Sequence, residues 1–449
     1  MQFKQYPSYK NSGVEWLGGV PEHWSITPLK FAIKNWRNGK WGYDVVEASD
    51  DNLVCVRVAD FDRQKGVINT EKLTLRNYKG ERVSDCLLNE NHILIERSGG
   101  GENQLVGATV KFSLNIKAVC SNFISLLEIK TNYFDLDFIQ YYFDHLYSLN
   151  VNKLSIKQTS GIQNLDLKQY VQNHISFPEI FEQTQIVLFL DTETARIDNL
   201  ISKQEKLIEL LEEQRKSIIS HAVTKGLNPN APMKDSGVEW LGEVPEHWEV
   251  TRLKNIGKSI IGLTYSPNEI CNPDDDSYLV LRSSNVQNGQ LSFLDNVYVK
   301  SYVSEKLKIK KNDILICSRN GSRDLIGKNT IIKNPPKNST FGAFMTVYRS
   351  EHADYVYWIL NSYIFKAQAG SYLTTTVNQL TINNLNNMTV PFAPTSEQNE
   401  IVEFLSTENL KFNNLISKQK ALIEKLKEYR ASIISHAVTG KIDVREFGA

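Results

Sequence analysis

The sequence predicts an α+β protein built from two similar halves, each with a domain of short strands and helices followed by one long helix. Two blocks of sequence that occur twice support this prediction, and so does a seven-residue apolar pattern within the longer block. The chain has 449 residues, of which 41% are hydrophobic and 23% are charged. This composition is typical of soluble globular proteins, and the length suits two large domains with connecting elements.

The internal repeat is the strongest signal in the chain. Residues 11–30 read NSGVEWLGGVPEHWSITPLK, and residues 235–254 read DSGVEWLGEVPEHWEVTRLK. A longer block begins with EQTQIVLFL at Glu182 and returns as EQNEIVEFL at Glu397, and both copies end in SIISHAVT. Between these blocks the halves differ more, although echoes such as VRVADF at Val56 and LRSSNV at Leu281 survive. Two long repeats predict pseudo-twofold symmetry and two similar sites.

The domain boundaries follow from the repeats. Short apolar and β-branched runs such as Leu53–Val58 and Asp313–Cys317, bounded by turn-forming residues, predict strands. Gly226 and Gly440 predict the ends of the two long helices. We therefore expect a first domain over 1–180, a first spacer helix over 181–226, a second domain over 227–395 with a linker at 227–234, a second spacer helix over 396–440 and a tail over 441–449.

The longer repeated blocks carry the heptad pattern of a coiled coil. Two mostly apolar columns recur every seven positions in each copy, and two matched seams predict that the helices pair with each other as an antiparallel coiled coil. A polar residue, Gln204 or Gln419, interrupts the same column in both copies and is expected to fix the register. The alternative is that each helix packs only on its own domain. The residues expected to pair the helices are Ile197, Leu200, Gln204, Leu207, Leu211, Ile218, Phe412, Leu415, Gln419, Leu422, Leu426 and Ile433.

Composition excludes several classes of protein. The five cysteines are far apart and form no C-x-x-C pair, so neither a disulfide framework nor a cysteine zinc site is expected. No apolar run reaches the length of a membrane span, and the first thirty residues lack a secretory signal, so we expect a cytoplasmic protein. Lysine plus arginine (51) equals aspartate plus glutamate (51), so any binding of nucleic acid depends on local patches or on partner subunits.

A search for catalytic motifs predicts no catalytic residues and no metal ligands. The fragment Asn334–Lys337 reads NPPK and lacks the aromatic residue that would stack on a flipped base. The glycine-rich fragment Gly321–Asn329 has the wrong spacing for a phosphate-binding loop and ends in asparagine where serine or threonine would ligate magnesium. Glu128 and Lys130 resemble part of a nuclease site, but no aspartate lies in the twenty residues before them.

Local charge is more informative than net charge. The stretch from Lys30 to Trp41 contains basic residues and two tryptophans without an acid, which suits phosphate contact. Glycine-rich loops at Arg97 and Arg319 add arginine, asparagine and glutamine, which can read base edges. The polar segments that begin at Lys157 and Thr374 are similar in both halves and therefore suit scaffold or phosphate contact better than discrimination between bases. The alternative for each is an ordinary solvated surface. The candidate DNA-binding residues are Lys34, Trp36, Arg37, Lys40, Trp41, Arg97, Ser98, Asn103, Gln104, Lys157, Gln158, Thr159, Lys258, Arg319, Asn320, Ser322, Arg323, Thr374, Thr375 and Asn378.

Several motifs together resemble the specificity subunit of type I DNA restriction and modification systems. They are the SGVEWLG-x-VPEHW blocks, the EQ-x-x-IV-x-FL start of each long helix, the LISKQ-x-x-LIE-x-L seam and the SIISHAVT ending. The likeness covers essentially the whole chain. It implies that each variable domain is a target-recognition domain that reads one half of a split, asymmetric sequence in double-stranded DNA.

The resemblance also implies a division of labour. The paired helices would act as a ruler and as a dock for methylase subunits, two in number, and restriction and translocase subunits would join the larger complex. This chain would be non-catalytic and bind no cofactor, while S-adenosylmethionine, ATP and magnesium would bind to the partner subunits. Two other classes remain open: a coiled-coil scaffold whose domains bind proteins without reading DNA, and a stand-alone modification enzyme. Salt-dependent DNA binding distinguishes the first, and S-adenosylmethionine binding by the isolated chain distinguishes the second.

Overall fold

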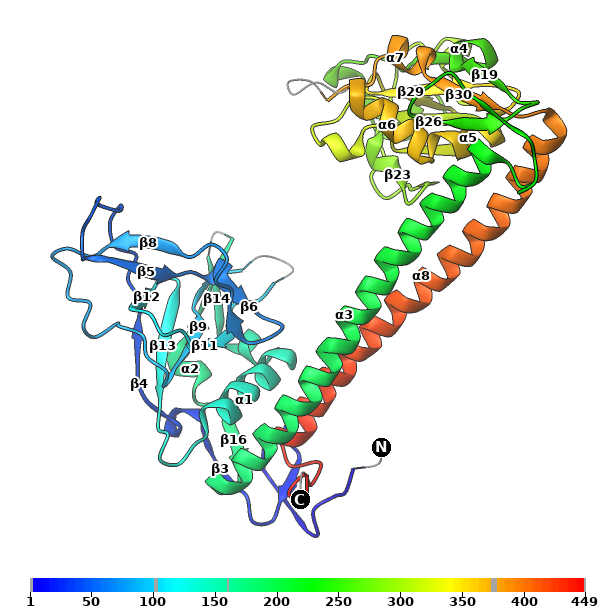
Figure 1. Ribbon diagram of the computed structural model, residues 1–449. Coiled ribbons are helices and arrows are strands. Elements are labelled where there is room, and N and C mark those ends of the chain that lie inside the picture. The colour runs from blue at the N-terminus through cyan, green and yellow to red at the C-terminus, as the bar shows by residue number, and fades with distance from the viewer. Residues whose placement is uncertain (1–2, 101–103, 160, 373–377, 448–449) are drawn as a thin grey trace. The chain divides into compact units, whose positions relative to one another are not determined.

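The computed structural model describes residues 3–100, 104–159, 161–372 and 378–447 (Figure 1). The chain forms two compact units. The first unit comprises Met1–Lys203 and Ala421–Ala449, and the second comprises Gln204–Lys420. Each unit therefore contains one mixed domain, the start of one long helix and the end of the other.

Two sheets organise the domain of the first unit. Four antiparallel strands lie in the order β11-β9-β13-β4, and three strands lie in the order β12-β5-β8, in which β12 and β5 are parallel. The helix α1 (Leu136–Ser148) contacts β11. The strands are β4 (Ile33–Asn38), β5 (Asn52–Val56), β8 (Thr74–Asn77), β9 (His92–Glu96), β11 (Thr109–Lys111), β12 (Ala118–Cys120) and β13 (Ile124–Ile129). Apolar residues of these strands, including Val110 and Leu126, form a buried core.

The second unit repeats this plan. Its larger sheet has the order β20-β29-β26-β27, and a neighbouring sheet has the order β21-β25-β22-β28, with β22 and β28 parallel. The strands are β20 (Lys258–Ile261), β21 (Ile270–Cys271), β22 (Tyr278–Leu281), β25 (Tyr298–Val299), β26 (Asp313–Cys317), β27 (Asn329–Ile332), β28 (Ser339–Phe341) and β29 (Met345–Arg349), and the helices are α5 (Ala353–Leu360), α6 (Tyr363–Tyr372) and α7 (Ile382–Asn387). The predicted α+β class with two pseudo-symmetric domains is confirmed.

The two long helices are α3 (Ile180–Lys225) and α8 (Thr395–Val438). In the first unit the Nε of Arg430 on α8 donates to Asp198 on α3 at 3.0 Å. In the second unit Arg215 on α3 donates to Asn413 on α8 at 3.0 Å. Each unit thus pairs an early part of one helix with a late part of the other, so the helices run antiparallel, as predicted.

The seam between the helices uses one of the two expected columns. Ile197, Phe412 and Ile433 of that column are buried, and its remaining members, Gln204, Leu211, Ile218, Gln419 and Leu426, are partly buried. The other expected column is mostly exposed: Leu207 is 38%, Leu415 42% and Leu422 40% exposed, and Leu200 is partly buried.

The second buried column instead lies one residue further along each helix. Ile201, Ile416 and Ile423 are buried, and Ile208, Arg215 and Arg430 are partly buried. Residues three and four positions after Ile197 are both apolar, and heptad spacing allows either step. Three of the leucines that the sequence pattern assigned to the seam, Leu207, Leu415 and Leu422, are therefore exposed.

The repeated scaffold block anchors the ends of the long helices. The chain turns out of α8 at Gly440, whose φ is +69°, and an added Cβ there would lie 2.4 Å from Pro21 Cδ. In the second unit Gly226, with φ +73°, ends α3 against Trp248, and an added Cβ would lie 3.3 Å from its ring. Glycine meets both requirements, a left-handed backbone and a close approach. Among the described residues, no helix has an apolar stretch long enough to cross a bilayer.

Candidate nucleic-acid interface

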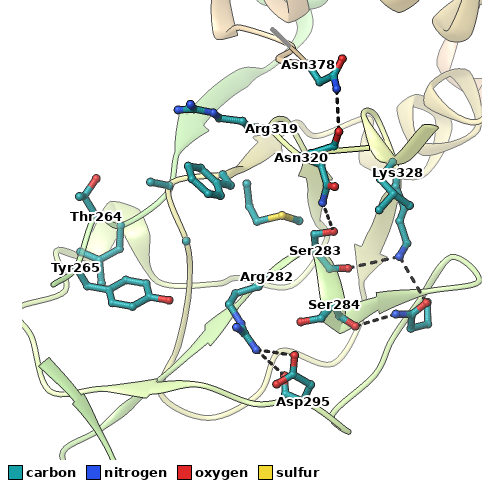
Figure 2. Close-up of a pocket in the computed structure, with 18 residues that line it drawn as sticks. Thr264, Tyr265, Arg282, Ser283, Ser284, Asp295, Arg319, Asn320, Lys328 and Asn378 are labelled. Atoms are coloured by element: carbon teal, nitrogen blue, oxygen red, sulfur yellow. Dashed lines mark hydrogen bonds and ion pairs between the residues drawn. The ribbon is translucent and has the colours of Figure 1, made fainter. Parts of the chain in front are cut away.

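A cleft of about 1200 Å³ in the second unit lies where strands of its two sheets end (Figure 2). The chain leaves β22 at Arg282 and leaves β26 at Ser318 and Arg319, and both ends open into the cleft. Another part of the cleft wall is formed by the segment that follows β20. The backbone there approaches β28 so closely that a Cβ on Gly262 would lie 2.2 Å from the carbonyl oxygen of Gly342. Only glycine permits that approach, which places Thr264 and Tyr265 on the cleft wall.

A chain of hydrogen bonds crosses the cleft floor. The Nδ2 of Asn378 donates to the carbonyl of Gly321 at 3.0 Å, and the Nδ2 of Asn320 donates to Ser283 Oγ at 3.1 Å. The Nζ of Lys328 donates to the Ser283 carbonyl at 3.4 Å, and Figure 2 shows its side chain directed to that residue. These contacts hold amide, hydroxyl and ammonium groups at defined positions on the cleft lining. Such groups can donate to, or accept from, base edges and phosphates.

Arginine 319 is the exposed cation of this cleft. The backbone nitrogens of Ser318 and Arg319 both donate to the carbonyl of Phe344 at 3.0 Å, which ties the two loops together. The guanidinium of Arg319 lies 5.1 Å from the centroid of the Phe344 ring, and that ring is 58% exposed. A guanidinium held against an aromatic face keeps its donors free for a ligand. Together they present a flat cationic and aromatic surface.

The second cation, Arg282, is held by a carboxylate. Its guanidinium lies 2.8 Å from Asp295 Oδ2 and also donates to the Asp295 carbonyl at 3.3 Å (Figure 2). The cleft lining as a whole contains Arg282, Arg319 and Lys328 against the one carboxylate of Asp295. The excess of positive charge favours a polyanionic ligand.

An equivalent cleft of about 860 Å³ lies at the corresponding strand ends of the first unit. Arg57 follows β5 as Arg282 follows β22, and Phe123 stands before β13 as Phe344 stands before β29. Ser98 occupies the place of Arg319, since its backbone nitrogen donates to the Phe123 carbonyl at 3.1 Å. The two clefts therefore share a framework and differ in the side chains that it presents.

Charge in the first cleft is balanced internally. The guanidinium of Arg57 lies 2.9 Å from Asp60, and that of Arg63 lies 2.7 Å from Glu96. Burial raises the pKa of Glu96, and the neighbouring Arg63 opposes that rise. The side chain of Gln104 lies against the same Arg63. With its cations committed to carboxylates, this cleft offers a ligand a different set of groups from the second cleft.

The basic stretch singled out from the sequence lies mainly outside the cleft lining. Lys34 pairs with Glu128 at 2.7 Å, Arg37 with Asp85 at 3.2 Å and Lys40 with Glu81 at 3.4 Å, so acids distant in sequence neutralise it in part. Trp36 lies on β4 and is partly buried. Trp41 does line the first cleft, and Arg76 lies 4.7 Å from its ring centroid.

Some of the other candidates line a cleft, and the rest lie outside it. Ser98 and Gln104 line the first cleft, and Arg319, Asn320 and Asn378 line the second. Arg97 lies beside the first cleft and donates to the Asn122 carbonyl at 3.3 Å. The exposed Ser322 and Arg323 lie beyond the second cleft lining, and Lys258 is exposed on β20.

Three of the remaining candidates, Lys157, Gln158 and Thr159, lie on β14 (Ile156–Thr159), which forms a hairpin with β15 (Ile162–Leu165). Lys157 pairs with Asp166 at 2.7 Å, and Gln158 is exposed. Thr159 lies at the end of β14. Asn103, Thr374 and Thr375 fall outside the described residues.

Sequence reasoning missed several residues that line the clefts. Arg57 and Arg282 stand inside the echoed fragments VRVADF and LRSSNV, so their shared position directly after a buried strand was a usable signal. The exposed aromatics Phe123 and Phe344 gave no such signal, because their role depends on loops that only the folded chain brings together. Among the described residues, no group of three or more histidine, cysteine, aspartate or glutamate side chains could hold a metal ion.

Comparison with known proteins gives a family and full-length relatives. The model of the type I restriction modification DNA specificity domain matches this chain twice, over residues 44–210 and 245–425. The specificity subunit of the type I restriction enzyme MjaVIII from Methanocaldococcus jannaschii is 26% identical over 458 residues, which cover 97% of each chain. The specificity subunit of the EcoKI enzyme from Escherichia coli is 29% identical over 212 residues, which cover 45% of this chain and 44% of that protein.

Solved structures share the fold. A chain solved in work on complex assembly and conformational transition of the type I R-M system aligns with a TM-score of 0.70 at 14% identity, over 93% of this chain and 98% of that one. The HsdS subunit from Thermoanaerobacter tengcongensis aligns with a TM-score of 0.51, also at 14% identity, over 94% and 98% of the two chains.

Proposed function

Because this chain belongs to the family of type I restriction-modification specificity subunits, we propose that its two clefts each read one half of a bipartite, asymmetric DNA target. The observation that supports this most strongly is the pair of equivalent clefts with different linings. A shared framework suits two similar tasks, and different side chains suit two different base sequences. The alternative from the sequence, a scaffold without DNA readout, gives no reason for polar, cationic and aromatic groups to gather in both clefts.

The two long helices provide the surface on which partner subunits dock. Leu207 on α3 and Leu422 on α8 occupy equivalent heptad positions and are 38% and 40% exposed. Exposed leucines recurring along charged helices are a common mark of an interaction surface. Since each helix carries one copy, we propose two equivalent sites, each for one methylase subunit. Restriction and translocase subunits then complete the assembly around the methylase core.

The chemistry of the complex belongs to these partners in our proposal. The methylase subunits hold S-adenosylmethionine, and the translocase subunits use ATP and magnesium. The chain itself contributes recognition, and the sequence search supports this, because each candidate catalytic motif departs from its required pattern.

Methylome sequencing after co-expression tests the proposal. The chain alone is expected to leave host DNA unmodified, and the chain with its methylase partner is expected to produce adenine methylation at one split motif. The Leu207→Glu and Leu422→Glu variants, each on one proposed docking surface, should each lower the amount of methylase that co-purifies. The Glu205→Lys variant, at an exposed position on α3 near Leu207, is the control for a change of charge on the helix. Methylation by the purified chain without partner would contradict the non-catalytic assignment.

A further inference from the structure

One loop of the second unit ends in an apolar tip that lies almost wholly in water. It joins β24 (Gln290–Leu291) to β25, and it carries Phe293 and Leu294, which are 49% and 98% exposed. A single exposed leucine is common on protein surfaces and means little alone. The significance of this one depends on how the loop is held and on what it adjoins.

A single buried residue fixes the base of the loop. Asn285 is fully buried, and its Nδ2 donates to the carbonyl oxygens of Ser292 at 3.0 Å and Asp295 at 3.1 Å. The backbone nitrogen of Ser292 in turn donates to the Asn285 carbonyl at 2.8 Å. Both ends of the tip are therefore tied to one point of the core, which holds Phe293 and Leu294 away from the body of the unit.

The tip adjoins the second cleft. Asp295, the next residue, lines that cleft and binds Arg282 (Figure 2). The backbone nitrogen of Val280 donates to the Val297 carbonyl at 2.9 Å, which sets the loop beside the end of β22 where Arg282 leaves the sheet. Leu294 is therefore the immediate neighbour in sequence of a residue that lines the cleft.

The first half has the same loop without the apolar tip. There the backbone nitrogen of Asn69 donates to the Asp60 carbonyl at 2.7 Å, as Ser292 does to Asn285. Asp60 and Asn285 also accept from the backbone nitrogens of Arg57 and Arg282, at 2.8 Å and 2.9 Å. The residues that follow are Thr70 and Glu71 where the second half has Phe293 and Leu294. The framework therefore does not require an apolar tip.

We propose that Phe293 and Leu294 form a wedge that enters a base step of the DNA bound by the second cleft, an inference that rests on the proposed function. Apolar side chains presented beside a cationic cleft can unstack a base step and bend the duplex. When the base step opens, contact between Leu294 and the unstacked base faces removes both surfaces from water. This burial offsets part of the free-energy cost of unstacking. The wedge acts on one half-site, because the first half carries Thr70 and Glu71.

The test uses the full-length chain with its methylase subunits and duplexes of the motif found by methylome sequencing. 2-Aminopurine, whose fluorescence rises when it is unstacked, replaces single adenines of the second half-site and its flank, one in each duplex. Wild type is expected to give a several-fold rise at one step in addition to any rise at the flipped target adenine. The double variant F293T/L294E carries the residues of the first half. It should lose the fluorescence rise at the wedged base step, keep the rise at the target adenine and bind the duplex about tenfold more weakly. The control T70A/E71A should match wild type.

The outcomes separate this inference from the proposed function. A wild-type complex that binds the motif but shows no unstacking beyond the target adenine would overturn the wedge and leave DNA recognition intact. The same holds if F293T/L294E retains the rise and binds normally. Failure of the wild-type complex to bind its motif in preference to unrelated DNA would remove the proposed function and the wedge with it. Because both side chains are exposed, the substitutions leave the core of the unit unchanged.

Discussion

The indole nitrogen of Trp24 donates a hydrogen bond of 3.0 Å to Glu182, and this contact joins the two blocks that recur in the sequence. His23 Nε2 lies 2.8 Å from the other carboxylate oxygen of Glu182. In the second unit Trp248 and Glu397 repeat the contact at 2.9 Å. The repeated histidine and tryptophan are thus a clamp on the first turn of each long helix. Each clamp fixes a recognition domain to the start of its own helix.

Removal of Glu182 is expected to destabilise the first unit. This carboxylate also accepts from the Tyr6 hydroxyl at 2.7 Å, and Glu182→Ala would leave two buried donors, those of Tyr6 and Trp24, without their acceptor, at a cost of about 3 kcal/mol. Glu397 is more exposed and accepts from one buried donor, the indole nitrogen of Trp248, beside the exposed His247, so Glu397→Ala should cost about 1 kcal/mol. Urea unfolding of the full chain measures both. Equal effects of the two variants would show that the Tyr6 contact adds nothing.

Arg319 and Lys40 are expected to act differently on DNA. Arg319→Ala removes an exposed guanidinium from the second cleft, and it should cost about 1–3 kcal/mol on the cognate site and relax specificity in one half-site. Arg97→Ala makes the same test beside the first cleft. Lys40→Ala should weaken binding to all sequences and reduce the slope of affinity against salt. Affinities for cognate and unrelated duplexes, measured over a series of salt concentrations, distinguish base reading from phosphate contact. An equal loss on both duplexes for the arginine variants would assign those residues to phosphate contact.

His145 is expected to make the first unit sensitive to acid. It is 3% exposed, neither ring nitrogen has a hydrogen-bond partner among the described residues, and burial, aided by His436 and Lys441, lowers its pKa from 6.5 to about 4. As the pH falls below 6.5, this histidine takes up a proton in the unfolded chain before it does so in the folded chain. The free energy of unfolding therefore falls by about 3 kcal/mol between pH 6.5 and 4. His145→Phe keeps the ring and removes the titration. Unfolding curves of both proteins from pH 8 to 4 should diverge over that window. Parallel curves would assign the acid sensitivity to other groups.

The helices are expected to set the gap between the half-sites. With 46 and 44 residues, α3 and α8 are about 65 Å long at ~1.5 Å per residue. One heptad inserted after Gln204 and one after Gln419 keeps both seams in phase and lengthens the connection by about 10 Å. The gap should grow by about three base pairs while the bases read in each half stay the same. The three added base pairs also rotate one half-site by about 100° around the duplex axis relative to the other. The substrate should therefore be a library of duplexes with different gap lengths. Modification of the original target with its original gap would contradict the ruler.

Much of the architecture could be predicted from the sequence because the repeats are local and strong. The heptad spacing identified two long helices, and duplication of every block implied pseudo-symmetric halves. The buried seam could be predicted only in part, since Leu200 and Ile201 are both apolar and both fit a heptad step from Ile197. Which of them is buried depends on the face that the partner helix covers.

The recognition clefts were less predictable. Lys34, Arg37 and Lys40 form a basic patch in the sequence, but folding brings Glu128, Asp85 and Glu81 to them from other elements. Conversely, Phe344 carries no signal in the sequence, and it becomes a cleft residue together with Arg282 because parallel strands end at the same place. Side-chain type identified plausible groups, and only tertiary contacts show which of them face a common cleft.

The central claim is that each domain reads one half of the DNA target independently, and exchange of one domain tests it most directly. Residues 31–180 are replaced by the corresponding region of a relative, which leaves both clamps and both helices in place. Methylome sequencing of a host that contains the methylase partner then compares the motifs of parent and chimera. We predict that one half of the split motif changes, while the other half remains as in the parent. A chimera that methylates the parental motif, or one whose motif changes in both halves, would contradict the claim.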